Sequence, residues 1–187
     1  MNLAAWFRKW ESTMGRYIFT FGAIAGLLVI GSITLGMALG GAGSAAGSEL
    51  AGYLIMLVAL SLIFIATKRY RDRELGGVIR FGKAFMLGLG IAAVAGVAYV
   101  LVWEIYLAST DYAFIEQYTA GFIAAEREAG ISPEELAALT ERMEQMKANY
   151  AKPWIRIPIT FSEIFPVGAI VSLISAAILR NPRVLPA

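Results

Sequence analysis

Four long apolar segments constrain the fold of this chain more than any other feature. A helix that crosses a bilayer needs about 20 mainly apolar residues, and such segments occur at about 17–40, 50–66, 84–107 and 158–179. The chain is only 16% charged, whereas a soluble domain has about 25% charged residues. We therefore predict an all-α membrane protein with four transmembrane helices, forming a single integral membrane domain over residues 1–187.

The distribution of basic residues predicts how these helices are oriented. Residues 1–16 hold three basic residues, residues 67–83 hold six, and the end of the chain adds Arg180 and Arg183, whereas the connection 41–49 holds none. Cytoplasmic connections carry an excess of Lys and Arg. We therefore expect a multi-pass protein of the cytoplasmic (inner) membrane with both termini in the cytoplasm.

The connection 67–83, TKRYRDRELGGVIRFGK, is predicted to be a basic loop that faces lipid. Such cations attract anionic lipid, each contributing about 1 kcal/mol near the surface. The simpler interpretation is that they only fix the orientation. The patch is short and lies against the membrane, so no nucleic acid is expected as a partner. The cations are Lys68, Arg69, Arg71, Arg73, Arg80 and Lys83.

The long outer connection, at about 111–152, is predicted to form an extracytoplasmic amphipathic helical hairpin. Ser132, Pro133 and Glu135 make a capping box, a strong signal for a helix start. Apolar residues recur every three or four positions on both sides of Gly130, as in amphipathic helices. The two helices could pack on each other, lie on the bilayer, or bind a protein partner.

Two acidic residues inside the spans are candidates for an intramembrane polar site. Glu104 and Glu163 lie near the outer ends of helices that run in opposite directions, so similar depths are expected. An ionisable residue in a span is by default a functional hypothesis, and a close pair could share a proton or bind a cation. A structural role is the alternative, with Arg156 or Lys152 as an ion partner of Glu104 or Glu163. Pro166 predicts a helix kink and frees the carbonyl of Ser162.

Small residues spaced four apart predict close helix packing. Such ridges let backbones approach closely, either within one bundle or between copies in a homo-oligomer. We favour packing within the bundle. Glu163 shares its helix face with Val167, Ile170 and Ile174, which suggests a central position for the fourth helix. The small residues are Gly22, Gly26, Gly36, Gly40, Ala92, Gly96, Gly168, Ser172 and Ala176.

Several stretches resemble a known family of bacterial membrane proteins. They are KRYRDRELGGVIRFGKAFMLGLGIA, the outer YAFIEQY and AGISPEELAALTERMEQM, and FPVGAIVSLISAAIL, with GGVIRFGKAF (76–85) and PVGAIVSLISAAIL (166–179) the most distinctive. Over about residues 15–180 the chain resembles the domain of unknown function 4199 family. The resemblance implies a bacterial four-helix membrane architecture and supplies no catalytic residues.

The missing residue types narrow the function. The chain has no Cys and no His, which excludes disulfides, thiol nucleophiles and the commonest transition-metal ligand. We therefore expect no catalytic residue, no metal, no cofactor and no enzymatic activity. The leading hypothesis is a small interaction or assembly protein. The alternative is a small transporter or channel-like protein that uses the paired carboxylates to handle protons or cations.

Overall fold

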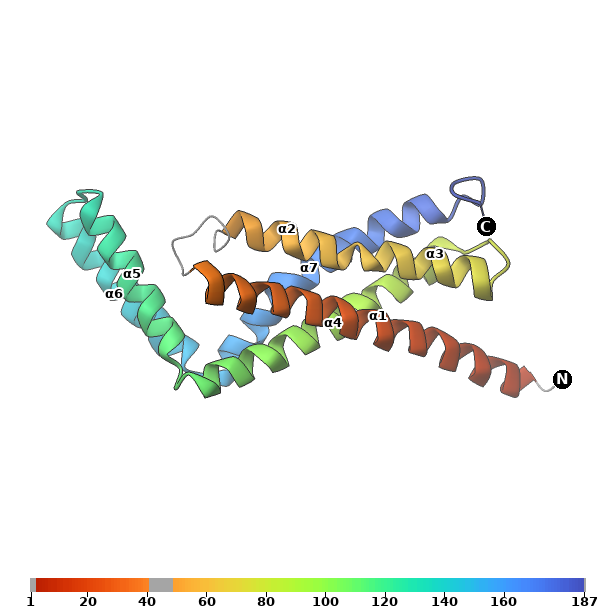
Figure 1. Ribbon diagram of the computed structural model, residues 1–187, viewed down its shortest axis with the longest axis horizontal. Helices are drawn as coiled ribbons and strands as arrows, with labels where there is room; N and C mark the ends of the chain where they lie inside the picture. Colours follow the sequence, from red (N-terminus) through yellow and green to blue (C-terminus); the bar gives the residue numbers. More distant parts are fainter. Residues whose placement is uncertain (1–2, 41–48, 187) are drawn as a thin grey trace. The chain divides into compact units, whose positions relative to one another are not determined.

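The computed structural model describes the backbone of residues 3–40 and 49–186, and the side-chain surroundings of residues 13–32 and 52–186. All regular structure in these residues is helical (Figure 1). The helices are α1 (Leu3–Gly40), α2 (Glu49–Leu60), α3 (Leu62–Glu74), α4 (Phe81–Ser109), α5 (Ala113–Glu128), α6 (Pro133–Tyr150) and α7 (Pro153–Leu179).

Within the described residues, four stretches are long and apolar enough to cross a membrane, as the sequence predicts. They are Thr13–Ser32 in α1, Gly52–Glu74 across α2 and α3, Phe81–Ser109 in α4, and Pro153–Leu179 in α7. Ser61 alone separates α2 from α3, and its amide still donates to the carbonyl of Leu57 at 2.9 Å. The two helices therefore act as one span.

The second span continues well beyond its predicted end at residue 66. Lys and Arg are good helix formers, so the helix stops only where two glycines adopt left-handed conformations, Gly76 (φ 65°) and Gly77 (φ 90°). The Gly77 amide donates to the carbonyl of Arg71 at 3.0 Å, which closes the helix end. The prediction of a loop over 67–83 is therefore wrong for residues 67–74, and also for residues 81–83, where α4 has already begun.

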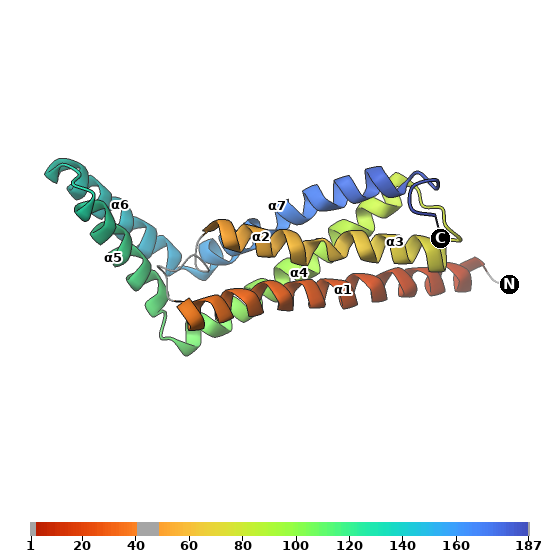
Figure 2. The same ribbon diagram turned by 45° about the horizontal axis from the view of Figure 1, so that its top comes forward.

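The chain folds into two compact units, residues 1–99 with 161–187, and residues 100–160. In the first unit, α1 runs antiparallel to α2 and α3 and contacts both (Figures 1 and 2). The start of α1, the α3–α4 connection and residues 180–186 lie at the same end of this unit (Figure 2). We call residues 180–186 the C-terminal tail.

Small residues lie where the helices of the first unit approach most closely. A Cβ added at Gly22 would lie 2.6 Å from the Cβ of Val94, and one at Gly168 would lie 2.5 Å from the Cβ of Ala92. Both distances are too short for a methyl group, so α4 packs on α1 and α7 through backbone. Added Cβ atoms at Gly26 and Gly96 would also lie within 3 Å of α4 and α7 atoms, and Ser172 and Ala176 are fully buried.

The pair Gly36 and Gly40 lies in α1, but the side-chain surroundings there fall outside the described residues. The prediction that this pair packs against another helix therefore stays a prediction.

The last helix, α7, begins at Pro153, five residues before its predicted start, and is continuous through Pro166. The predicted kink at Pro166 stays a prediction. One face of α7 is open, because Ile170 and Ile174 are 58% and 53% exposed. The expectation that both faces of this helix are used for packing is therefore wrong. Small residues on the opposite face already meet α4, so one face suffices.

In the second unit, α5 and α6 lie side by side (Figure 1). The predicted capping box forms at the start of α6. The Ser132 hydroxyl accepts from the Glu135 amide at 3.2 Å, and the Glu135 carboxylate accepts from the Ser132 amide at 3.0 Å. An ion pair of 2.5 Å between Lys147 and Glu116 links the two helices.

Candidate functional site

The second unit contains a buried ion pair between Arg156 of α7 and Glu104 of α4. Arg156 Nε donates to Glu104 Oε1 at 2.7 Å, and Arg156 Nη2 donates to Glu104 Oε2 at 2.6 Å. The Arg156 side chain is 2% exposed and that of Glu104 is 24% exposed. A bidentate pair of this kind fixes orientation as well as charge.

The remaining surface of Arg156 is also engaged. Its Nη1 donates to the carbonyl of Tyr150 at 2.8 Å, and its guanidinium lies 5.1 Å from the ring centre of Tyr112 and 5.7 Å from that of Tyr150. The Tyr150 hydroxyl in turn accepts from Trp103 Nε1 at 2.8 Å. Tyr112, just before α5, and Tyr150, the last residue of α6, therefore both contact Arg156 of α7. Tyr150 also contacts Trp103 of α4.

Glu163 has a different partner and lies in the first unit. Its carboxylate accepts a hydrogen bond from the Tyr99 hydroxyl at 3.0 Å, and its side chain is exposed on α7. Ser162, the neighbouring candidate, is also exposed. Both lie toward the surface that a bilayer would cover.

These contacts weaken the hypothesis that the two carboxylates act as a pair. Both oxygens of Glu104 accept hydrogen bonds from Arg156. Paired, directional hydrogen bonds of this kind are typical of a structural guanidinium–carboxylate ion pair. The ion-partner interpretation therefore describes Glu104 better. Within the described residues, no three Asp or Glu side chains are grouped so that they could hold a metal ion.

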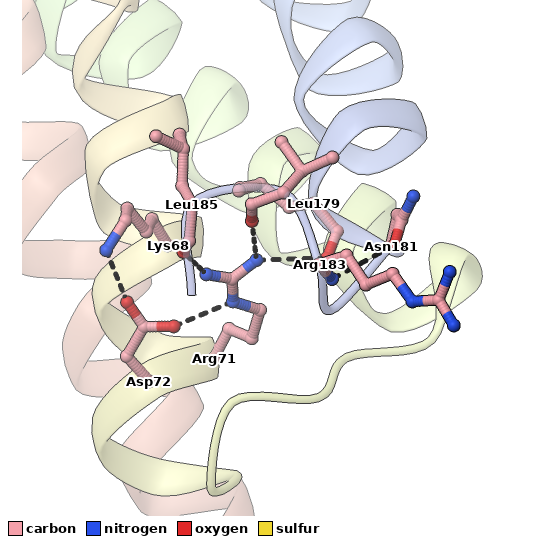
Figure 3. Close-up of polar contacts among 8 residues, drawn as sticks. Lys68, Arg71, Asp72, Leu179, Asn181, Arg183 and Leu185 are labelled. Atoms are coloured by element: carbon pink, nitrogen blue, oxygen red, sulfur yellow. Dashed lines mark hydrogen bonds and ion pairs between the residues drawn. The ribbon is translucent and has the colours of Figure 1, made fainter. Parts of the chain in front are cut away.

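The first unit contains a second buried cation, Arg71 of α3. Its side chain is fully buried, and its Nε donates to Asp72 Oδ1 at 2.7 Å. Figure 3 shows the guanidinium pointing toward the C-terminal tail. There Nη1 donates to the carbonyls of Leu179 (3.4 Å) and Val184 (3.0 Å), and Nη2 donates to that of Leu185.

This arrangement corrects one predicted lipid contact. Arg71 does not face lipid, because backbone carbonyls surround it. The end of a helix leaves carbonyls without helical partners, and at Leu179 the guanidinium supplies a donor. Asp72 also accepts from Lys68 Nζ at 2.6 Å. The other predicted cations, Arg69, Arg73, Arg80 and Lys83, keep at least part of their surface exposed.

Sequence reasoning missed the partners that define these sites. Tyr99 lies 64 residues from Glu163, and the carbonyl of Val184 in the tail lies 113 residues from Arg71. Tyr150 is only six residues from Arg156, but it contributes a backbone carbonyl, which no residue type marks. No motif links them. In each of these interactions the sequence pointed only to the charged residue, because a charge is unusual in or next to an apolar helix.

Aromatic side chains form a row along α5. Phe114, Tyr118 and Phe122 are spaced four residues apart, and neighbouring ring centres lie 6.1 and 6.4 Å apart with nearly parallel planes. The row begins at Trp103, whose ring meets Phe114 edge to face at 4.9 Å. Tyr118 and Phe122 are 47% and 40% exposed. A row of exposed rings outside the four apolar spans is a candidate interaction surface.

The comparisons with known proteins agree with the resemblance seen in the sequence. No curated protein and no solved structure matched the chain significantly. A family model described as "Protein of unknown function (DUF4199)" matches residues 20–181. This match includes all of α2–α7 and most of the apolar part of α1. The chain therefore belongs to the DUF4199 family.

Proposed function

We propose that the protein is a small interaction or assembly protein of the bacterial inner membrane, and that it binds a protein partner through α5. The aromatic row on α5 carries this proposal. Aromatic residues dominate the energetics of protein interfaces. Two of its rings, Tyr118 and Phe122, are 47% and 40% exposed and lie outside the apolar spans.

The surroundings of the row support a protein partner. No residue of α6 is buried, and in α5 only Thr119 is buried. The side chains of these two helices are therefore largely accessible to a partner. Residues 108–157 hold eight acidic and five basic residues, which disfavours contact with anionic lipid. We therefore expect a partner with an apolar groove whose rim is basic, since complementary charge guides association.

The orientation follows from the basic residues. Arg16, Arg69 and Arg73 line one recess, and Arg71, which lies between two of them on α3, contacts the C-terminal tail. By the positive-inside rule this end of the first unit faces the cytoplasm, which puts α5 and α6 outside. A reporter enzyme inserted after Gly130 tests this orientation, and activity of the reporter in the cytoplasm would contradict it.

Site-specific photocrosslinking in intact cells tests the binding surface. A photoreactive residue at position 122 is expected to give one discrete product with another protein. The same residue at Ala124, which is exposed on another face of α5, is the matched control and gives none. Tyr118→Ser should abolish the product formed from position 122. Equal products from both positions, or a product that consists of two copies of this chain, would refute the proposal.

A transport function has weaker support. It depends on paired carboxylates, and Glu104 is already engaged by Arg156. Ion flux through proteoliposomes that carry the Glu163→Gln variant gives the direct comparison. A flux that depends on Glu163 would favour transport over the interaction role.

A further inference from the structure

A crevice between α1 and α3 combines cationic and apolar walls. Its volume is about 430 Å³, and Arg16 of α1 lines it together with Arg69 and Arg73 of α3. Arg69 and Arg73 lie one helical turn apart, so their side chains share a face. The two helices contact each other in the first unit (Figure 1). Three guanidinium groups from two helices therefore line one recess.

The three arginines have no acidic partner among the side chains that the structure describes. Nearby Asp72 is held by Lys68 and Arg71, and Glu74 accepts from the Tyr17 hydroxyl at 3.3 Å. The recess therefore carries an excess of positive charge. Arginine recognises phosphate with paired, directional hydrogen bonds.

The apolar wall extends from these cations into the span. Phe21 and Ile24 of α1 also line the crevice, and Ile24 is 43% exposed. From Arg16 to Ile24 the helix rises about 12 Å. The recess thus combines a cationic end with an apolar wall that continues along α1.

We propose that this crevice binds an anionic phospholipid. The phosphodiester lies among Arg16, Arg69 and Arg73, and one acyl chain follows Phe21 and Ile24. The general attraction of a basic segment to a charged bilayer needs no such geometry. Two features distinguish a specific lipid site from such general attraction. Arg16 belongs to α1, whereas Arg69 and Arg73 belong to α3, and an apolar wall adjoins the three arginines.

Native mass spectrometry of the full-length, delipidated protein in detergent tests the site. Phosphatidylglycerol and phosphatidylcholine with identical acyl chains are added in parallel titrations. Wild type is expected to retain one phosphatidylglycerol and to prefer it over phosphatidylcholine. Arg16→Gln and Arg73→Gln should each weaken retention of phosphatidylglycerol about five-fold, the factor that one cation near an anionic surface contributes.

Arg183→Gln is the matched control. Arg183 is an exposed arginine of the C-terminal tail, at the same end of the unit, and its replacement should leave retention unchanged. Equal weakening in this control would show general charge attraction and overturn the proposal. Equal retention of the two lipids would overturn it as well.

A third titration with glycerol 1-phosphate separates the two parts of the ligand. Binding as strong as that of phosphatidylglycerol would show that the acyl chain contributes nothing, which would overturn the lipid assignment. The single variants replace exposed side chains, so folding is expected to persist. Circular dichroism and size-exclusion chromatography check this before each titration.

Discussion

Replacing Glu104 by glutamine tests whether its ion pair holds the second unit together. In Glu104→Gln one oxygen still accepts from Arg156, but the new amide group turns a donor toward a donor. Arg156 is 2% exposed, so its charge loses its counterion in a place that water hardly reaches. Removing one partner of a buried pair costs about 3–5 kcal/mol. Because Glu104 is 24% exposed, we expect the lower end, about 3 kcal/mol.

The double variant Glu104→Leu with Arg156→Met removes both charges of the pair. It therefore separates the effect of losing the whole ion pair from the effect of leaving Arg156 buried without a counterion. Replacing a buried ion pair with apolar residues of similar size is often neutral. We therefore expect the double variant to lie within about 1 kcal/mol of wild type. The Tyr150 carbonyl loses its donor in this variant, which accounts for the remaining cost.

Equilibrium unfolding in mixed micelles with increasing dodecyl sulfate, followed by circular dichroism, gives the free energies. Lys147→Gln removes the exposed pair with Glu116 and should leave the unfolding midpoint unchanged, since exposed pairs contribute little. A cost below about 1 kcal/mol for Glu104→Gln would refute a structural role for the pair. So would a double variant that is as unstable as the single one.

Three further predictions concern other parts of the chain. Arg71→Met should release the C-terminal tail, because its carbonyls lose their donor, and hydrogen exchange in the tail should then rise to the rate of an unfolded peptide. Gly168→Ala should lower the free energy of unfolding by about 1–3 kcal/mol in the same assay, because its methyl would lie 2.5 Å from the Cβ of Ala92. Gly15→Ala is the control and should not lower it, since the space around Gly15 is open. Hydrogen bonds from Ser132 lower the pKa of Glu135 from its ordinary value of 4.5, so this part of the α6 cap is stable above pH 4.5 and weakens as the pH falls below it. Protection of the Ser132 amide, relative to its intrinsic exchange rate at each pH, should fall over that range, because the carboxylate that accepts from it becomes protonated. In Ser132→Ala the Glu135 amide loses its acceptor, so the protection of that amide should be lost at neutral pH.

The spans were predictable because the bilayer imposes a single length and polarity on each of them. The start of α6 was predictable for a local reason, since Ser132, Pro133 and Glu135 carry its whole capping box within four residues. The end of the second span was not predictable from apolarity alone. Charged residues continue that helix to Glu74. Lysine and arginine interrupt an apolar segment, but they are good helix formers, so the helix continues where the apolar segment stops.

The candidate sites were only half predictable. Glu104 and Arg156 were both identified, but their bidentate contact depends on how α4 and α7 meet, which no local pattern encodes. Arg71 was misassigned for the same reason. Apart from Asp72, its acceptors are backbone carbonyls more than 100 residues away, and a carbonyl has no residue type to recognise. The exposure of Ile170 and Ile174 could not be predicted from the sequence either, since residues that face lipid and residues in a core are equally apolar.

The Arg71 contacts also impose an order on biosynthesis. During translation Arg71 emerges from the ribosome long before Leu179, Val184 and Leu185. Until then its guanidinium has only Asp72, a neighbour on its own helix, as an intramolecular partner. The guanidinium of Arg71 therefore reaches its full set of acceptors only after residues 184 and 185 have been synthesised, although all four spans are complete before that point.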